Sequence, residues 1–123
     1  MYNILVIDDE PDIRTLFSRF LARAGYSVED AEDGEKGMNV MHNKPIDLVI
    51  TDIIMPNKEG VETILELRAK YPDVKIIAMS GGGRNIAAED ALGFVENLGV
   101  FETFQKPFDR HEVLEAVEAA LAN

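Results

Sequence analysis

The sequence has 123 residues, of which 46% are apolar and 28% charged, and it contains no cysteine. This length and composition exclude global disorder and predict one domain with its own core over residues 1–123. The lack of cysteine excludes disulfide bonds, thiolate metal sites and cysteine nucleophiles. With 23 acidic and 12 basic residues the formal charge is −11, which disfavours nucleic-acid binding by this chain and favours divalent cations.

The N-terminal sequence carries no basic region ahead of its apolar residues. No apolar run approaches the length needed to cross a bilayer. We therefore expect a cytoplasmic protein that makes no membrane contact. This expectation rests on absent signals, and a domain excised from a longer protein would look the same.

The first half of the chain predicts two strand–helix units and a third strand. Residues 4–7 (ILVI) are a short apolar run, typical of a strand buried on both faces. An apolar stripe at helical spacing then predicts a helix that stops at Gly25: Ile13, Leu16, Phe17, Phe20, Leu21 and Ala24. Residues 26–28 are a weaker strand candidate. Residues 34–43 are expected to form a helix and residues 48–50 a buried strand.

The second half continues the same alternation. Val61, Ile64, Leu65 and Arg68 share one face of a predicted helix that ends before Tyr71-Pro72. Residues 74–79 predict a buried strand, 85–98 a helix and 101–104 a weaker strand. A last amphipathic helix has the apolar face Val113, Leu114, Val117, Ala120 and Leu121. Five strand–helix units with short connections predict a doubly wound α/β sandwich around a parallel sheet.

Polar side chains follow four of the five predicted strands. They are Asp8, Asp9 and Glu10 after residues 4–7, Thr51 and Asp52 after 48–50, Ser80 after 74–79, and Lys106 after 101–104. In open α/β sheets ligands bind beyond the carboxyl ends of the strands. We therefore expect carboxylates, a hydroxyl and an ammonium group to converge at one edge of the sheet.

Each of these residues alone has a simpler explanation. An acidic residue before a helix is often an N-cap, a serine before glycines a turn, and a single lysine a solvated charge. However, unpaired carboxylates at one edge would repel one another, so the coincidence favours a functional site. Clustered carboxylates suit Mg²⁺, and a further carboxylate could attack a phosphoryl group to form an acyl phosphate.

The chain resembles the receiver domain of bacterial two-component response regulators. Four segments in the family's order and spacing carry the resemblance: VIDDE (6–10), TDIIMPNKEG (51–60), MSGGG (79–83) and QKPF (105–108). They cover the chain from end to end, as in single-domain chemotaxis regulators. The resemblance implies a flavodoxin-like (βα)5 sandwich whose five-stranded parallel sheet has the order 2-1-3-4-5.

The resemblance also implies a role for each site residue. Asp52 is expected to accept the phosphoryl group, while Ser80 and Lys106 contact it. The expected Mg²⁺ ligands are Asp8, Asp9, Asp52 and the backbone carbonyl of Ile54. The Lys106–Pro107 peptide is expected to be cis. Pro56 and Gly60 are expected to shape the loop after Asp52.

Two features depart from the family's pattern. The position three residues before the lysine, usually Tyr or Phe, is Thr103, so we expect the output to be read differently across residues 85–108. Three glycines, residues 81–83, follow Ser80 and leave the backbone free to move. Neither Ile54 nor Gly82 offers a side chain that could orient an attacking water, which predicts slow self-dephosphorylation.

We therefore expect a signalling receiver that catalyses only its own phosphoryl uptake and hydrolysis. The resemblance implies a histidine kinase or phosphotransfer protein as donor. It also implies that the surface of residues 80–108 changes to control a downstream protein or an output domain. A dimer that forms on phosphorylation is compatible with this reading. The chain is either a stand-alone regulator or a receiver cut from a longer protein.

Three alternatives use the same fold. An aspartyl-phosphate phosphatase needs a carboxylate two residues after its nucleophile; Asp8 has Glu10 there but Asp52 has Ile54, and the usual cap insertion is missing. A flavin-binding module needs a hydroxyl-rich phosphate loop after the first strand. Here that position has the acidic sequence DDEP, which would repel phosphate. An interaction domain that is never phosphorylated would be expected to lack a site residue, and none is missing.

Overall fold

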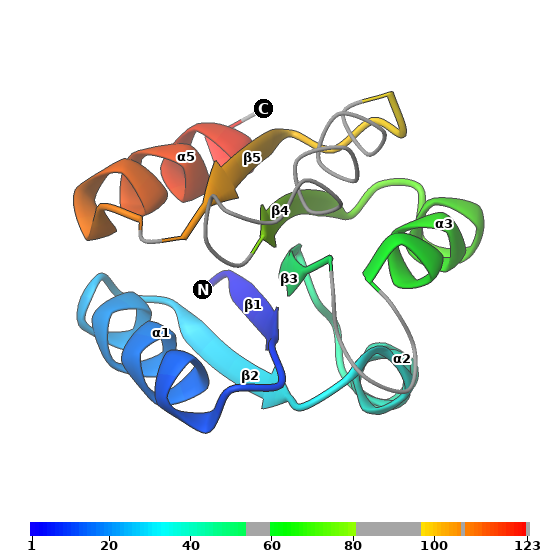
Figure 1. The fold of residues 1–123 in the computed structure, drawn as a ribbon, viewed down its shortest axis with the longest axis horizontal. Helices are drawn as coiled ribbons and strands as arrows, with labels where there is room; N and C mark the ends of the chain where they lie inside the picture. The colour runs from blue at the N-terminus through cyan, green and yellow to red at the C-terminus, as the bar shows by residue number, and fades with distance from the viewer. Residues whose placement is uncertain (54–59, 81–96, 107, 123) are drawn as a thin grey trace.

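A parallel five-stranded sheet in the order β2-β1-β3-β4-β5 forms the middle layer (Figure 1). This computed structural model describes residues 1–53, 60–80, 97–106 and 108–122. The strands are β1 (Asn3–Ile7), β2 (Ser27–Ala31), β3 (Leu48–Asp52), β4 (Lys75–Ser80) and β5 (Glu102–Gln105). All four neighbouring pairs are parallel, which confirms the predicted sheet order and the flavodoxin-like α/β fold.

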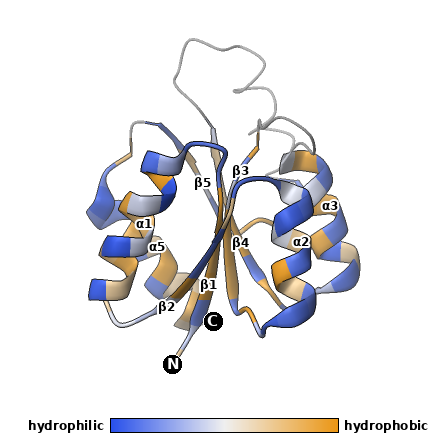
Figure 2. Ribbon diagram, turned by 90° about the horizontal axis from the view of Figure 1, so that it is seen from below, coloured by the Kyte–Doolittle hydropathy of each residue, from blue (hydrophilic) through white to orange (hydrophobic). Residues whose placement is uncertain are grey.

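Helices cover both faces of the sheet. The helices α1 (Pro11–Arg23) and α5 (Arg110–Ala122) lie on one face, and α2 (Gly34–Asn43) and α3 (Gly60–Lys70) lie on the other (Figure 2). None of the helices in the described part of the chain is long and apolar enough to span a membrane.

The central strands bury side chains on both faces because successive side chains of a strand point to opposite sides. Leu5, Ile7 and Val49 belong to the core under α2 and α3. Ile4, Val6 and Ile50 belong to the core under α1 and α5. This arrangement explains why these strands read as unbroken apolar runs in the sequence.

Strand ends differ from the predictions where the side chains are polar. β3 continues past residue 50 because Thr51 and Asp52 still pair with Ala78 and Met79 of β4. The edge strand β2 runs to residue 31 rather than 28, since its polar residues pair with β1 by backbone alone. A pattern of apolar residues cannot show either extension.

Two predicted helix faces need correction. The buried face of α3 is formed by Gly60, Thr63, Ile64 and Leu67, whereas Leu65 is 47% exposed. Ile64 is buried and Val61 packs against the core as predicted, but a buried glycine and a buried threonine replace apolar residues on the rest of this face, so the predicted stripe is wrong at Leu65. In α1, Leu16 lies at the solvent edge of the predicted stripe and is 42% exposed.

Helix ends follow the expected glycine signals in part. α1 ends at Arg23, and Gly25 has a φ of 99°, a left-handed conformation that favours glycine. The predicted helix over 85–98 falls mostly on residues 81–96, which lie outside the described residues. Its predicted end is wrong, because residues 97–99 form a turn before β5.

Candidate functional site

The carboxyl end of β1 places Asp8 inside the protein. Its side chain is fully buried, with 0% exposed. The Asp8 N–H donates to the carbonyl of Ala31 (3.1 Å), which keeps the chain beside β2 for one residue beyond the strand. The N–H of Glu10 donates to Asp8 Oδ1 at 2.9 Å and turns the chain toward α1. The following carboxylates, Asp9 and Glu10, therefore reach solvent.

The carboxyl end of β3 places Asp52 in a buried position, 3% exposed. The start of α3 packs directly on its backbone, where the Gly60 N–H donates to the carbonyl of Ile53 at 3.0 Å. A Cβ atom on Gly60 would lie 2.1 Å from the Asp52 carbonyl oxygen. Glycine is thus required at residue 60 by this close approach, and it fixes the main chain that carries Asp52.

Lys106 joins the two buried carboxylates. Its Nζ donates to Asp8 Oδ2 at 2.8 Å and to Asp52 Oδ2 at 3.0 Å, and it lies 3.5 Å from Glu10 Oε1. Burial alone would lower the pKa of Lys106, but the hydrogen bonds and charges of Asp8 and Asp52 outweigh burial and raise this pKa above its ordinary value. The ammonium group therefore stays charged and holds β1, β3 and the end of β5 together.

Ser80 ends β4 beside this group. It is 1% exposed, and its Oγ has no hydrogen-bond partner within the described ranges. The backbone N–H of Lys106 donates to the Ser80 carbonyl at 2.8 Å. A buried hydroxyl without a partner is unfavourable by about 1–3 kcal/mol. The site thus keeps one hydroxyl donor available for a group that enters it.

The structure brings most of the predicted site residues to one edge of the sheet. Lys106 contacts Asp8 and Asp52 directly, and Ser80 is tied to Lys106 through the backbone. The carboxylates of Asp8, Asp9 and Glu10 lie within 4.8 Å of one another. Ile54, Pro56, Pro107 and residues 81–83 lie outside the described residues, so the carbonyl ligand and the cis peptide stay predictions.

Three contributions were missed from the sequence. Glu10, which the sequence places among the polar residues at this edge without a role of its own, joins the acidic cluster and approaches Lys106. Arg14 Nη1 donates to the Asp8 carbonyl at 2.7 Å. Gly60 was expected to serve a turn, and it instead begins α3 against Asp52. Only Glu10 had a sequence signal, because contacts to backbone atoms leave no residue pattern.

The donor set at this edge fits a hard divalent cation. Asp8, Asp9, Glu10 and Asp52 supply carboxylate oxygens, while one ammonium group, that of Lys106, offsets part of their charge. Mg²⁺ prefers one or two carboxylates with several waters, which a partly exposed acidic cluster can accommodate. The exposed carboxylates of Asp9 and Glu10 can meet a cation from solvent.

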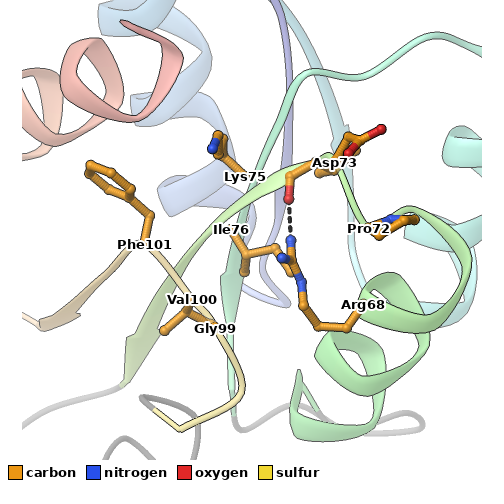
Figure 3. Close-up of a pocket in the computed structure, with 9 residues that line it drawn as sticks. Arg68, Pro72, Asp73, Lys75, Ile76, Gly99, Val100 and Phe101 are labelled. Carbon is orange, nitrogen blue, oxygen red and sulfur yellow. Dashed lines mark hydrogen bonds between the residues drawn. The ribbon is translucent and has the colours of Figure 1, made fainter. Parts of the chain in front are cut away.

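A separate pocket of about 380 Å³ lies at the other end of β4 (Figure 3). Arg68 of α3 closes one side of it by donating to the Val74 carbonyl. Burial lowers the pKa of this guanidinium. Because Arg68 holds α3 to the start of β4, we interpret the pocket as structural.

The described fold and the acidic sheet edge define a doubly wound α/β domain with a site at the carboxyl ends of its strands. Comparison with known proteins gives its family. The family model of the response regulator receiver domain matches residues 4–118. The chain therefore belongs to the response regulator receiver family. Members of this family act in two-component signalling, and the chain is a phosphorylation-dependent signalling domain.

Individual relatives agree with this assignment. The chain is 36% identical over 118 residues to the DNA-binding transcriptional regulator NtrC of Azospirillum brasilense, covering 96% of this chain and 24% of that protein. A receiver domain protein from Clostridium thermocellum matches with a TM-score of 0.90 and 28% identity, covering 99% of this chain and 95% of that one.

The response regulator TrrA from Thermotoga maritima was solved in complex with Mg²⁺-BeF. It is 36% identical, with a TM-score of 0.80, covering 98% of this chain and all of that one (100%). The curated relatives are longer, and this chain spans between 24% and 50% of the lengths of NtrC and the response regulator MprA of Mycobacterium.

Proposed function

We propose that Asp52 is the residue that accepts the phosphoryl group. The observation that carries this proposal is the position of Asp52 at the end of a central strand, buried and bonded to Lys106 at 3.0 Å. Asp8 is also buried there, but its Oδ1 accepts from the Glu10 N–H and so shapes the loop that leads into α1. Asp9 and Glu10 are exposed and follow Asp8 in the same loop.

The chain's own residues supply three parts of the chemistry. A carboxylate oxygen of Asp52 forms a bond to phosphorus while the bond from phosphorus to the donor breaks. The leaving group keeps the electron pair and takes a proton from solvent. Lys106 balances the charge of the phosphoryl oxygens, and Ser80 Oγ donates a hydrogen bond to one of them.

We further propose that the acidic cluster binds Mg²⁺, with Asp8, Asp9, Asp52 and the backbone carbonyl of Ile54 as its ligands. When bound, the cation supplies positive charge at the phosphoryl oxygens. The clustered oxygens of Asp8 and Asp9 support their part of this assignment, and Lys106, bonded to both Asp8 and Asp52, places Asp52 beside them. The Mg²⁺-BeF complex of TrrA supports the choice of cation.

The resulting signal is proposed to pass through residues 80–108. Drawing Ser80 Oγ toward a phosphoryl group moves the end of β4, to which the backbone of Lys106 is bonded. We propose a histidine kinase or phosphotransfer protein as donor and a protein or an output domain as target. Thr103 is too small to act as a rotating aromatic, so its contribution is expected to be minor.

Intact-mass spectrometry after incubation with acetyl phosphate tests the assignment. The parent chain with Mg²⁺ should gain one phosphoryl group, and it should gain far less when the cation is chelated. Asp52→Asn should gain none, while Asp73→Asn, which changes an exposed acid at the opposite end of the sheet, should match the parent. Full labelling of the Asp52→Asn variant would show that another residue is the acceptor.

A further inference from the structure

The side chain of Arg14 spans three elements beside the acidic cluster. Arg14 lies in the first turn of α1, and its Nη1 donates to the Asp8 carbonyl at 2.7 Å. Its Nε lies 3.7 Å from Asp30 Oδ2 on β2. The Arg14 side chain is 20% exposed. The guanidinium thus connects α1 and β2 to the chain that leaves β1.

The Asp8 carbonyl belongs to the peptide bond that leads into Asp9. The backbone N–H of Arg14 also donates to the carbonyl of Glu10 at 3.2 Å. The Arg14 side chain thus holds the Asp8 carbonyl and the backbone of α1 holds the Glu10 carbonyl, one on each side of Asp9. No contact of Arg14 with a carboxylate of the acidic cluster is found in the described part of the chain. Its side chain contacts the loop after β1 through a backbone carbonyl, and its other partner is the Asp30 carboxylate on β2.

We propose that Arg14 is a positioning residue for the Mg²⁺ site, a proposal that rests on the proposed function. Arg14 acts through the Asp8–Asp9 peptide, whose orientation sets the direction of the Asp9 carboxylate. Asp30 holds the guanidinium from the other side, so β2 supports the site although none of its residues belongs to the acidic cluster.

The positive charge of Arg14 and its positioning role have opposite effects on Mg²⁺ affinity. As a nearby positive charge it opposes the binding of a cation, so removing the charge alone would strengthen Mg²⁺ binding. As a support for the loop it favours binding, so removing the support would weaken it. Lysine keeps the charge but lacks the planar, forked guanidinium that reaches the Asp8 carbonyl and Asp30 together. Substitutions of Arg14 therefore separate the two effects.

Calorimetric titration with Mg²⁺ tests the proposal. Both Arg14→Lys and Arg14→Met should lose about tenfold in Mg²⁺ affinity, the size typical of groups that orient a metal ligand. Arg19→Met, which removes an exposed arginine from the same helix, should bind as the parent does. An Arg14→Lys variant with the parent's affinity, or an Arg14→Met variant that binds more tightly, would overturn the proposal.

A measurement without cation completes the test. In Mg²⁺-free buffer, amide hydrogen exchange at residues 8–10 should be faster in both Arg14 variants, while exchange in β3 and β4 stays unchanged. Unchanged exchange at residues 8–10 would contradict the positioning role even if affinity fell. Failure of the proposed function looks different: the parent would then bind no Mg²⁺, or Asp9→Ala would bind it unchanged.

Discussion

The ends of β3 and β4 lie side by side in the sheet, but they treat their buried polar groups differently. At the end of β3, Thr51 Oγ1 donates to the Asp52 carbonyl at 2.9 Å, and Asp52 accepts from Lys106. At the end of β4, Ser80 Oγ has no partner within the described ranges. The charged half of the site is thus held in place, and the hydroxyl half is left available to respond.

Of the substitutions considered, removing Lys106 should cause the largest loss of stability, because Lys106 holds the charged half of the site. Lys106→Met leaves two buried carboxylates without their shared cation, and breaking a buried pair in this way destabilises by about 4 kcal/mol. Urea unfolding at pH 7 without Mg²⁺ measures this loss. Lys44→Met is the matched control, because its ion pair with Glu29 (3.0 Å) is much more exposed and is worth about 0.5 kcal/mol or less. Equal losses would contradict the central role of Lys106.

The ion pairs of Lys106 with Asp8 and Asp52 also predict how the stability depends on pH. The folded protein raises the pKa of Lys106 above its unfolded value of about 10.4. The stabilisation is therefore fully present below that unfolded value and is lost as pH rises through the folded pKa. The stability gap between the parent and Lys106→Met should be constant from about pH 7 to 10 and narrow above that. A gap that already narrows between pH 7 and 9 would argue against a charged Lys106 as the partner.

The backbone under Asp52 gives the next effect. Gly60→Ala places a Cβ atom against backbone atoms of Asp52 and Ile53, which should destabilise by about 3 kcal/mol and slow phosphorylation. In Gly37→Ala the new atom meets mainly the end of the Ile7 side chain, at 2.5 Å from Cδ1, so a smaller loss and normal phosphorylation are expected. Thermal unfolding and acetyl phosphate labelling of both variants check this contrast.

Much of the fold and of the site could be predicted from the sequence. The apolar runs of β1, β3 and β4 and the residues just after them placed Asp8, Asp52 and Ser80 at one edge, because parallel strands share the direction of their carboxyl ends. The resemblance to receivers then supplied the sheet order and a role for each residue. Both sources use side-chain identity, which is what a sequence records.

The contacts that involve the backbone could not be predicted in the same way. Arg14 binds a carbonyl, Gly60 matters for the atom it lacks, and the buried face of α3 depends on Thr63 rather than on Leu65. None of these changes the pattern of apolar and polar residues. The sequence also does not show that Ser80 Oγ lacks a partner among the described residues, since a missing partner depends on the folded surroundings alone.

Binding of Mg²⁺ to the acidic cluster should raise the free energy of unfolding by a smaller amount. A ligand that binds only the folded chain adds about 1.4 kcal/mol at a concentration about ten times its Kd. The melting temperature should therefore rise in millimolar Mg²⁺. Asp9→Ala should remove most of this rise, since Asp9 is one of the two exposed carboxylates of the cluster and a proposed ligand of the cation. An unchanged melting temperature in the parent would mean that the carboxylates do not form a cation site.

The smallest expected effects on stability come from removing the hydroxyl groups of Thr51 and Ser80. They test directly whether the ends of β3 and β4 differ. Thr51→Val removes a buried hydroxyl that has a partner, so it should destabilise by about 1 kcal/mol. Ser80→Ala removes a buried hydroxyl that has no partner within the described ranges, so it should not destabilise the protein and should instead stabilise it by about 1 kcal/mol. Urea unfolding of the two variants in parallel measures this difference.

For the response to phosphorylation we expect the opposite order, with Ser80→Ala affected more than Thr51→Val. Hydrogen exchange across residues 80–104, with and without acetyl phosphate, should show the parent's response in Thr51→Val and in Thr103→Ala. Ser80→Ala should still accept the phosphoryl group on Asp52 yet lose most of the response. If Ser80→Ala destabilises as much as Thr51→Val does, its hydroxyl is already bonded in the resting protein. The Ser80 hydroxyl would then have to break that bond before it meets a phosphoryl group. The proposed difference between a bonded Asp52 and an available Ser80 would be contradicted.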